Sequence, residues 1–183
     1  PMRTIHFFKC LYEADLRQNG GRKAQAMGVH LDERGRVHLP IRVEAAGGSI
    51  NAIPVDYFTN AFLALMEASG KGGVFHIVNP KQTPVRNLLT FAKRFFGVTG
   101  IRIAESGAPS ESAPNGLEKL FQAYLEVYRP YMNDARRFAD ERTRAILDRR
   151  GILCPDLDYA IFSRCMQYAL DAEWKDGSGH GSA

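Results

Sequence analysis

Apolar residues in the first third of the chain follow two different periodicities. Positions three to four apart predict a helix over 3–17, and positions two apart predict a strand over 36–44. Pro40 has no N–H group, so it confines that strand to the edge of a sheet. The polar, glycine-bearing segment 18–35 between them predicts a loop. The residues that carry the two patterns are Ile5, Phe8 and Tyr12 for the helix and Val37, Leu39, Ile41 and Val43 for the strand.

The middle of the chain alternates between strand and helix patterns. Asp56 is expected to cap one helix, and Thr83 is expected to cap a second, with Pro84 at its first position. The first of these helices has apolar residues at helical spacing, and they predict its buried face: Phe58, Ala61, Phe62, Leu65 and Met66. Short apolar runs predict three further strands, at 50–55, 74–78 and 101–103.

The last third of the chain is expected to be mainly helical. Apolar stripes predict helices over 117–128, 134–150 and 158–174. The patterns divide the chain into the end of an α/β sheet (1–104), a linker-like loop (105–115), a helical C-terminal lobe (116–176) and a disordered tail (177–183).

This order of elements predicts the α/β fold class, with few short strands and a mainly helical C-terminal half. A complete doubly wound sheet with helices on both faces needs more strands than these. We therefore expect the sheet to continue in residues that are not present. The start at Pro1 and Met2 is consistent with an internal boundary of a longer protein.

Composition narrows the possible functions only slightly. The chain has 183 residues and a net charge of +4, which fits one globular domain and makes no case for nucleic acid. Arginines in 136–150 alternate with acidic residues, which favours a solvated helix face. An anion-binding surface on this helix is the alternative.

The cysteines and the apolar runs indicate in which cellular compartment the protein is expected. Cys10, Cys154 and Cys165 are widely spaced, so we expect reduced, buried thiols in a cytoplasmic protein. No apolar run is long enough to cross a membrane, and no signal peptide is recognisable.

Motifs for catalysis are missing from the sequence. It has no glycine-rich dinucleotide turn of the G-x-G-x-x-G type, and none of its tyrosines is followed by lysine four positions later. The histidines show no metal-binding spacing. We therefore assign no catalytic and no metal-binding residue.

Two motifs carry a resemblance to a known family. They are Ser-Ile-Asn-Ala-Ile-Pro-Val-Asp-Tyr at 49–57 and Gly-Val-Phe-His-Ile-Val-Asn-Pro at 73–80. Together they resemble the extended short-chain dehydrogenase/reductase superfamily, which includes NAD-dependent epimerases and dehydratases. The most similar branch is that of thioester and fatty-acyl reductases (male-sterility-like). The clear likeness covers 49–97, and a looser one extends to 174.

The resemblance implies a function for the chain as part of a larger enzyme. It implies the C-terminal, substrate-binding portion of an NAD(P)-dependent, Rossmann-type reductase that acts on an acyl thioester, free or carrier-bound, or on another small carbonyl compound. NADP or NAD would bind to an upstream nucleotide-binding domain that this chain lacks, so the chain alone is expected to be inactive. An exposed sheet edge and apolar patch would favour a homo-oligomer.

Two alternatives stay open at this point. One is a fragment of a sugar-nucleotide epimerase or dehydratase, and the other is a non-catalytic α/β binding or interaction domain. The residues that the resemblance suggests for the substrate or cofactor cleft are Asn51, Pro54, Asp56, Tyr57, His76, Asn79 and Pro80, with His6, Phe7 and Tyr12 on the first helix.

Overall fold

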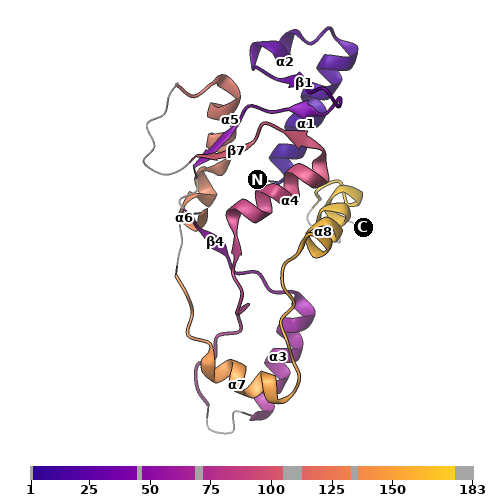
Figure 1. The fold of residues 1–183 in the computed structure, drawn as a ribbon. Helices are drawn as coiled ribbons and strands as arrows, with labels where there is room; N and C mark the ends of the chain where they lie inside the picture. Colours follow the sequence, from indigo (N-terminus) through magenta and orange to yellow (C-terminus); the bar gives the residue numbers. More distant parts are fainter. Residues whose placement is uncertain (1, 45–46, 69–71, 105–112, 133–135, 176–183) are drawn as a thin grey trace, which may run out of the picture.

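The computed structural model shows helices packed around a few short strands (Figure 1). It describes residues 2–44, 47–68, 72–104, 113–132 and 136–175. The helices are α1 (Met2–Gln18), α2 (Arg22–Ala26), α3 (Val55–Ala68), α4 (Val85–Phe96), α5 (Gly116–Leu125), the 3₁₀ turn η1 (Glu126–Tyr128), α6 (Arg129–Met132), α7 (Glu141–Arg149) and α8 (Tyr159–Asp171). The predicted α/β class is confirmed.

The strands are two or three residues long and form three small sheets. They are β1 (His30–Leu31), β2 (Val37–His38), β3 (Arg42–Glu44), β4 (Ser49–Ile50), β5 (Thr83–Pro84), β6 (Val98–Thr99) and β7 (Arg102–Ala104). Strand β2 pairs antiparallel with β1 and parallel with β6, while β3 pairs parallel with β7. The third sheet is the antiparallel pair of β4 and β5.

A proline explains why the single strand predicted over 36–44 is divided. Pro40 separates β2 from β3 and offers no N–H group to a neighbouring strand. The residues on either side still bond to the β6–β7 segment, since Leu39 N–H donates to Thr99 O and Arg102 N–H donates to Ile41 O.

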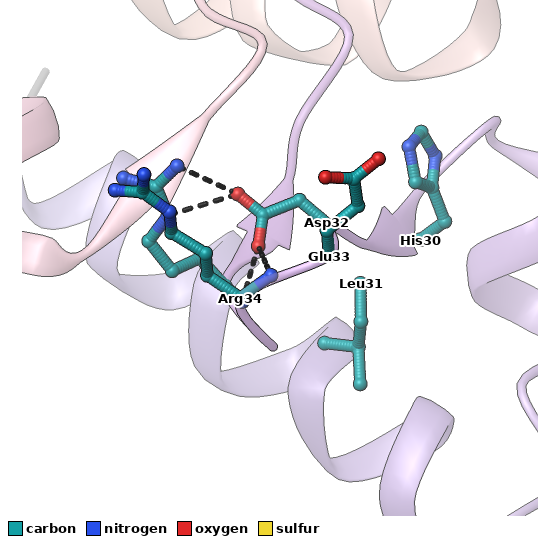
Figure 2. A pocket seen from close by; sticks show the side chains of 6 residues that line it. His30, Leu31, Asp32, Glu33 and Arg34 are labelled. Carbon is teal, nitrogen blue, oxygen red and sulfur yellow. Dashed lines mark hydrogen bonds and ion pairs between the residues drawn. The ribbon is translucent and has the colours of Figure 1, made fainter.

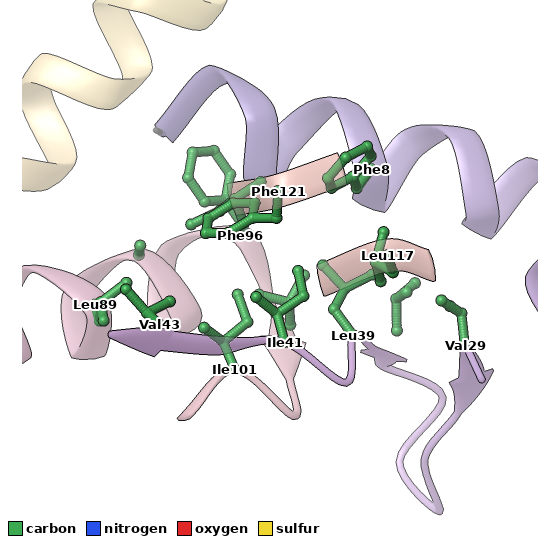
Figure 3. Packing of buried hydrophobic residues seen from close by; sticks show 14 of the residues in the cluster. Phe8, Val29, Leu39, Ile41, Val43, Leu89, Phe96, Ile101, Leu117 and Phe121 are labelled. Atoms are coloured by element: carbon green, nitrogen blue, oxygen red, sulfur yellow. The ribbon is translucent and has the colours of Figure 1, made fainter. Parts of the chain in front are cut away.

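The main hydrophobic core lies between these strands and the helices α1, α4, α5 and α8 (Figure 3). Ile5 and Phe8 from α1 meet Phe121 from α5 and the buried face of α4, which ends at Phe96. Helix α4 stops there because Gly97 adopts a left-handed conformation, in which its N–H bonds to Lys93 O. The predicted helix 3–17 and its inward residues are thus confirmed as part of this core.

A second, smaller core lies at the other end of the molecule, where α3 packs against α7 (Figure 1). It contains Tyr57, Ala61, Ala64, Leu65 and Leu147. The predicted inward face of α3 is therefore partly wrong, because Phe58, Phe62 and Met66 are exposed.

A buried carboxylate ties α5 to the sheet. Glu118 forms a capping box with Asn115 and also accepts hydrogen bonds from the backbone N–H and the guanidinium of Arg42 on β3. These bonds, led by the one from the Arg42 side chain, lower the pKa of Glu118. The charge is thereby tolerated although the side chain is almost fully buried.

Three predicted elements are wrong. The segment 18–35 is not one loop, because it contains α2 and β1, and the buried carboxylate of Asp15 accepts the Ala24 N–H at 2.9 Å to hold α2 in place. The stretch 74–78 forms no strand ladder with any described segment. Thr83 lies in β5 and does not cap α4, which starts after Pro84.

Other boundaries differ by smaller amounts. The strand predicted over 50–55 is reduced to β4, because α3 already begins at Val55. The long helix predicted over 134–150 begins only at Glu141, while 133–135 lie outside the described residues. The predicted linker is described only over 113–115, and the predicted tail lies outside the description.

Gly100 is the position where the fold most strictly requires glycine. Its φ of +85° disfavours other residues, and an added Cβ would lie 2.5 Å from Leu39 O and 2.7 Å from His38 Nε2. We expect Gly100→Ala to lower the free energy of unfolding by roughly 3 kcal/mol, from strained backbone plus overpacking. Urea unfolding measures it.

Gly35→Ala is the matched control. Gly35 has a φ of +72° but nothing within 4 Å of an added Cβ, so only backbone strain applies, about 1 kcal/mol. Equal losses for the two variants would contradict the close packing of Gly100.

Candidate functional site

The candidate site is a cleft of about 620 Å³ lined by two segments of the chain. One wall is the segment 78–82, which leads into β5, together with Asn51, which follows β4. The opposite wall is formed by residues 137–144, which lead into the first turns of α7. These two walls are far apart in the sequence.

Two asparagines fix the first wall. Asn51 and Asn79 bond reciprocally, since Asn51 Nδ2 donates to Asn79 O at 2.8 Å and Asn79 N–H donates to Asn51 Oδ1 at 2.8 Å. The Asn79 side chain, only 3% exposed, donates to Ala52 O and Pro155 O and accepts the Lys81 N–H. All the polar atoms of this amide are thus in use, so it shapes the cleft rather than offering bonds to a ligand.

The second wall is held in place through backbone carbonyls. Gln82 Nε2 donates to Arg136 O at 2.9 Å, and His76 Nδ1 lies 2.9 Å from Ala139 O. These side chains bond carbonyls in the segment just before α7. They give a physical reason why the helix begins only at Glu141.

Charged side chains of both signs line the cleft. Lys81 pairs with Asp156 at 2.8 Å, and Arg144 pairs with Asp140 at 3.1 Å. Arg137 also lines the cleft and has no ion-pair partner within the described ranges. The Phe138 side chain adds an exposed apolar surface beside it.

The structure brings three of the suggested cleft residues together. Asn51, Asn79 and Pro80 all line the cleft. His76 borders the cleft. Its ring bonds the backbone carbonyl of Ala139, and its centroid lies 5.5 Å from the centroid of the Phe138 ring.

The other suggested residues on this side lie at the start of α3. Asp56 is exposed, and Tyr57 is buried in the second core together with Cys154. Burial raises the pKa of Tyr57 and raises that of the Cys154 thiol to about 11. Both therefore stay protonated at neutral pH. Pro54 accepts the Phe58 N–H through its carbonyl and starts the helix.

The candidates on α1 lie in the main core region, apart from the cleft. Tyr12 is buried and Phe7 is exposed. His6 accepts a hydrogen bond from Trp174 Nε1 at Nδ1, 3.3 Å away. Burial, with a contribution from Lys9, lowers the pKa of His6 and favours its neutral form.

One residue of the second wall could be suspected from the sequence, but Asp140 could not. Arg137 belongs to the arginine-rich stretch for which anion binding was the alternative interpretation. Asp140 carried no recognisable signal, because only the tertiary fold buries its side chain.

The three cysteines do not form a reactive cluster. Cys10 and Cys165 are exposed, so the expectation that all three are buried is wrong. All three are free thiols. Among the described residues, no group of three or more histidine, cysteine or acidic side chains is placed to hold a metal ion.

A second concavity, of about 380 Å³, follows the turn between β1 and β2 (Figure 2). Asp32 dominates it, but its carboxylate accepts the N–H groups of Arg34 and Arg36 and pairs with the Arg36 side chain at 2.8 Å. The carboxylate is occupied by its own turn, so we interpret this concavity as structural.

Comparison with solved structures finds a similar fold. The terminal R domain from the myxalamid PKS-NRPS biosynthetic pathway superimposes with a TM-score of 0.53 at 18% identity, over 75% of this chain. The chain spans 37% of that domain's length. The likeness establishes a fold shared with part of this domain. No family model and no curated protein matches the sequence.

Within the ranges that the structure describes, no helix combines the length and apolarity needed to cross a bilayer.

Asn79 offers a direct test of how the cleft is held together. Asn79→Ala leaves Ala52 O, Pro155 O and Lys81 N–H without their partner, so we expect a loss of roughly 2–4 kcal/mol in the free energy of unfolding. Denaturant titration followed by circular dichroism measures the loss.

Asn60→Ala supplies the control, since Asn60 is exposed on α3. Alanine is the better helix former, so stability should stay within about 0.5 kcal/mol or rise slightly. A loss at Asn79 no greater than that at Asn60 would mean that the amide network does not hold the wall.

Proposed function

We propose that this chain is the substrate-binding part of an NAD(P)-dependent reductase of the extended short-chain type, acting on an acyl thioester or another carbonyl compound. A nucleotide-binding domain would complete the enzyme. The fold shared with part of a terminal reductase domain supports the proposal. The main observation in its support is that the α/β layer around α3 is incomplete among the described residues: a strand-like segment is unpaired and one apolar face of the helix is exposed.

The segment 74–78 has the character of a strand without a sheet. Its residues alternate, with Phe75 and Ile77 packed on the second core while Val74 and His76 are exposed. No described strand pairs with it. Unpaired backbone of this kind is a template for a further strand, which a neighbouring sheet would supply.

Helix α3 shows the matching feature. One face packs on the second core, and the other exposes the aromatic rings of Phe58 and Phe62, stacked 6.1 Å apart, beside Met66 at 62% exposure. A helix that is apolar on both faces is typical of a buried position between two layers. The partner that we propose to cover it is the nucleotide-binding domain.

The dinucleotide itself does not fit the residues of this chain. The sequence has no glycine-rich turn to approach a pyrophosphate, and the cleft has one unpaired cation among its described residues, Arg137. The cofactor, NADP or NAD, would therefore be held elsewhere in the complete enzyme. The role of this chain would be to bind and orient the substrate.

The apolar face of α3 makes a prediction for the isolated chain. We expect concentration-dependent self-association in sedimentation velocity experiments, because the exposed face will seek another apolar surface. Phe62→Glu should restore a monomer without lowering the melting temperature, since this ring is 48% exposed.

Tyr168→Glu is the control, on a 75%-exposed residue of α8 that lies away from α3. It should leave the association unchanged. A wild-type chain that stays monomeric at every concentration would favour an independent binding domain instead.

Substrate binding is tested on the isotopically labelled chain by NMR. Octanoyl-pantetheine should shift the backbone amides of 78–82 and 137–144 in a saturable way, whereas NADPH should give no saturable shift below about 1 mM. Saturable binding of NADPH, or no response to the thioester, would contradict the proposal. UDP-glucose in place of the thioester separates the epimerase alternative.

A further inference from the structure

Asp140 carries a polar atom whose environment the fold does not explain. The residue is 8% exposed, and its Oδ2 is the one buried side-chain oxygen or nitrogen in the described part of the chain without a hydrogen-bond partner. Although Asp140 precedes α7, its side chain does not cap that helix. A buried acceptor without a donor costs about 1–3 kcal/mol, so its presence calls for a reason.

The neighbouring arginine does not supply that reason. Arg144 Nε lies 3.1 Å from Asp140 Oδ2, close enough for an ion pair but outside hydrogen-bond geometry. The Arg144 side chain is 45% exposed, and ion pairs with such exposed partners contribute roughly 0–1 kcal/mol. Both residues line the cleft, so a movement of this guanidinium would open Oδ2 to a bound molecule.

The same cleft holds a cation that is available for binding. Lys81 and Arg144 already have carboxylate partners, but Arg137 has none among the described residues. Glu141, in the first turn of α7, disfavours an anion at the helix N-terminus. An anionic group in the cleft is therefore expected at Arg137, whose planar guanidinium suits phosphate oxygens.

We propose that the cleft recognises a small molecule at two points. A hydroxyl or amide N–H of the ligand donates a hydrogen bond to the carboxylate of Asp140, and a phosphate group of the ligand binds to Arg137. Phe138, 53% exposed beside them, covers the apolar part of the molecule. The proposal rests on the proposed function only in taking this cleft as the substrate site.

Calorimetric titration with two related probes tests the phosphate contact. 4′-Phosphopantetheine and pantetheine share their hydroxyl and amide groups and differ by one phosphate. We expect the wild-type chain to bind the phosphorylated probe about tenfold more tightly. Arg137→Gln should remove this difference and leave pantetheine binding unchanged. Arg86→Gln, the same change on an exposed residue of α4, should leave both affinities within about twofold.

Asp140→Asn tests the donor contact. It keeps the shape of the side chain but removes the charge, so both probes should bind about tenfold more weakly. The melting temperature should change little, because the ion pair that is lost involves a 45%-exposed arginine side chain and contributes only roughly 0–1 kcal/mol. A fall of several degrees with unchanged affinities would show a structural role and overturn the proposal.

The remaining outcomes separate this proposal from the proposed function. Wild-type affinities retained by both variants would overturn the two-point site, even if octanoyl-pantetheine still maps to the cleft. UDP-glucose binding that depends on Asp140 and Arg137, without binding of either pantetheine probe, would support the two-point site and contradict the thioester substrate. Binding of none of these probes to the wild-type chain would overturn the two-point site.

Discussion

The buried amide of Asn79 is the interaction on which the cleft depends. It joins three segments: the exit of β4 at Ala52, its own turn through Lys81, and the chain before α8 at Pro155. These segments pass between the two cores, where no large apolar cluster holds them. Hydrogen bonds to a single saturated side chain therefore set their spacing.

Because the polar groups of Asn79 in the first wall bond neighbouring segments of the chain, the second wall supplies the side chains that are available to a ligand. Gln82 and His76 hold the backbone of this wall at Arg136 and Ala139. The Arg137 and Asp140 side chains line the cleft without hydrogen-bond partners among the described residues. One wall is structural and saturated, and the other is polar and unsatisfied. Such a division of roles is typical of sites that are organised before a ligand arrives.

The exposed face of α3 and the unpaired segment 74–78 share one feature: no layer among the described residues covers them. Both faces of a helix are buried only when a further layer of structure packs on each side of it. Here Phe75 and Ile77 cover one side of α3, while Phe58, Phe62 and Met66 on the other side remain in solvent. The fold that this chain shares with a terminal R domain likewise spans 37% of that domain.

Elements with long and regular apolar spacing could be predicted from the sequence. Helices α1, α3, α4 and α8 and the α/β class follow from periodicity, and Gly97 ends α4 as its position suggests. The two family-like motifs also pointed to Asn51, Asn79 and Pro80, which the fold brings to one cleft.

Which surfaces those elements contact depends on how the whole chain packs. The segment 74–78 has strand composition, but a strand exists only when another backbone pairs with it. The second wall of the cleft could not be predicted from the sequence for a similar reason. Arg137 and Asp140 are ordinary members of a charged stretch, and only the folded chain buries Asp140 while leaving Arg137 exposed at the cleft.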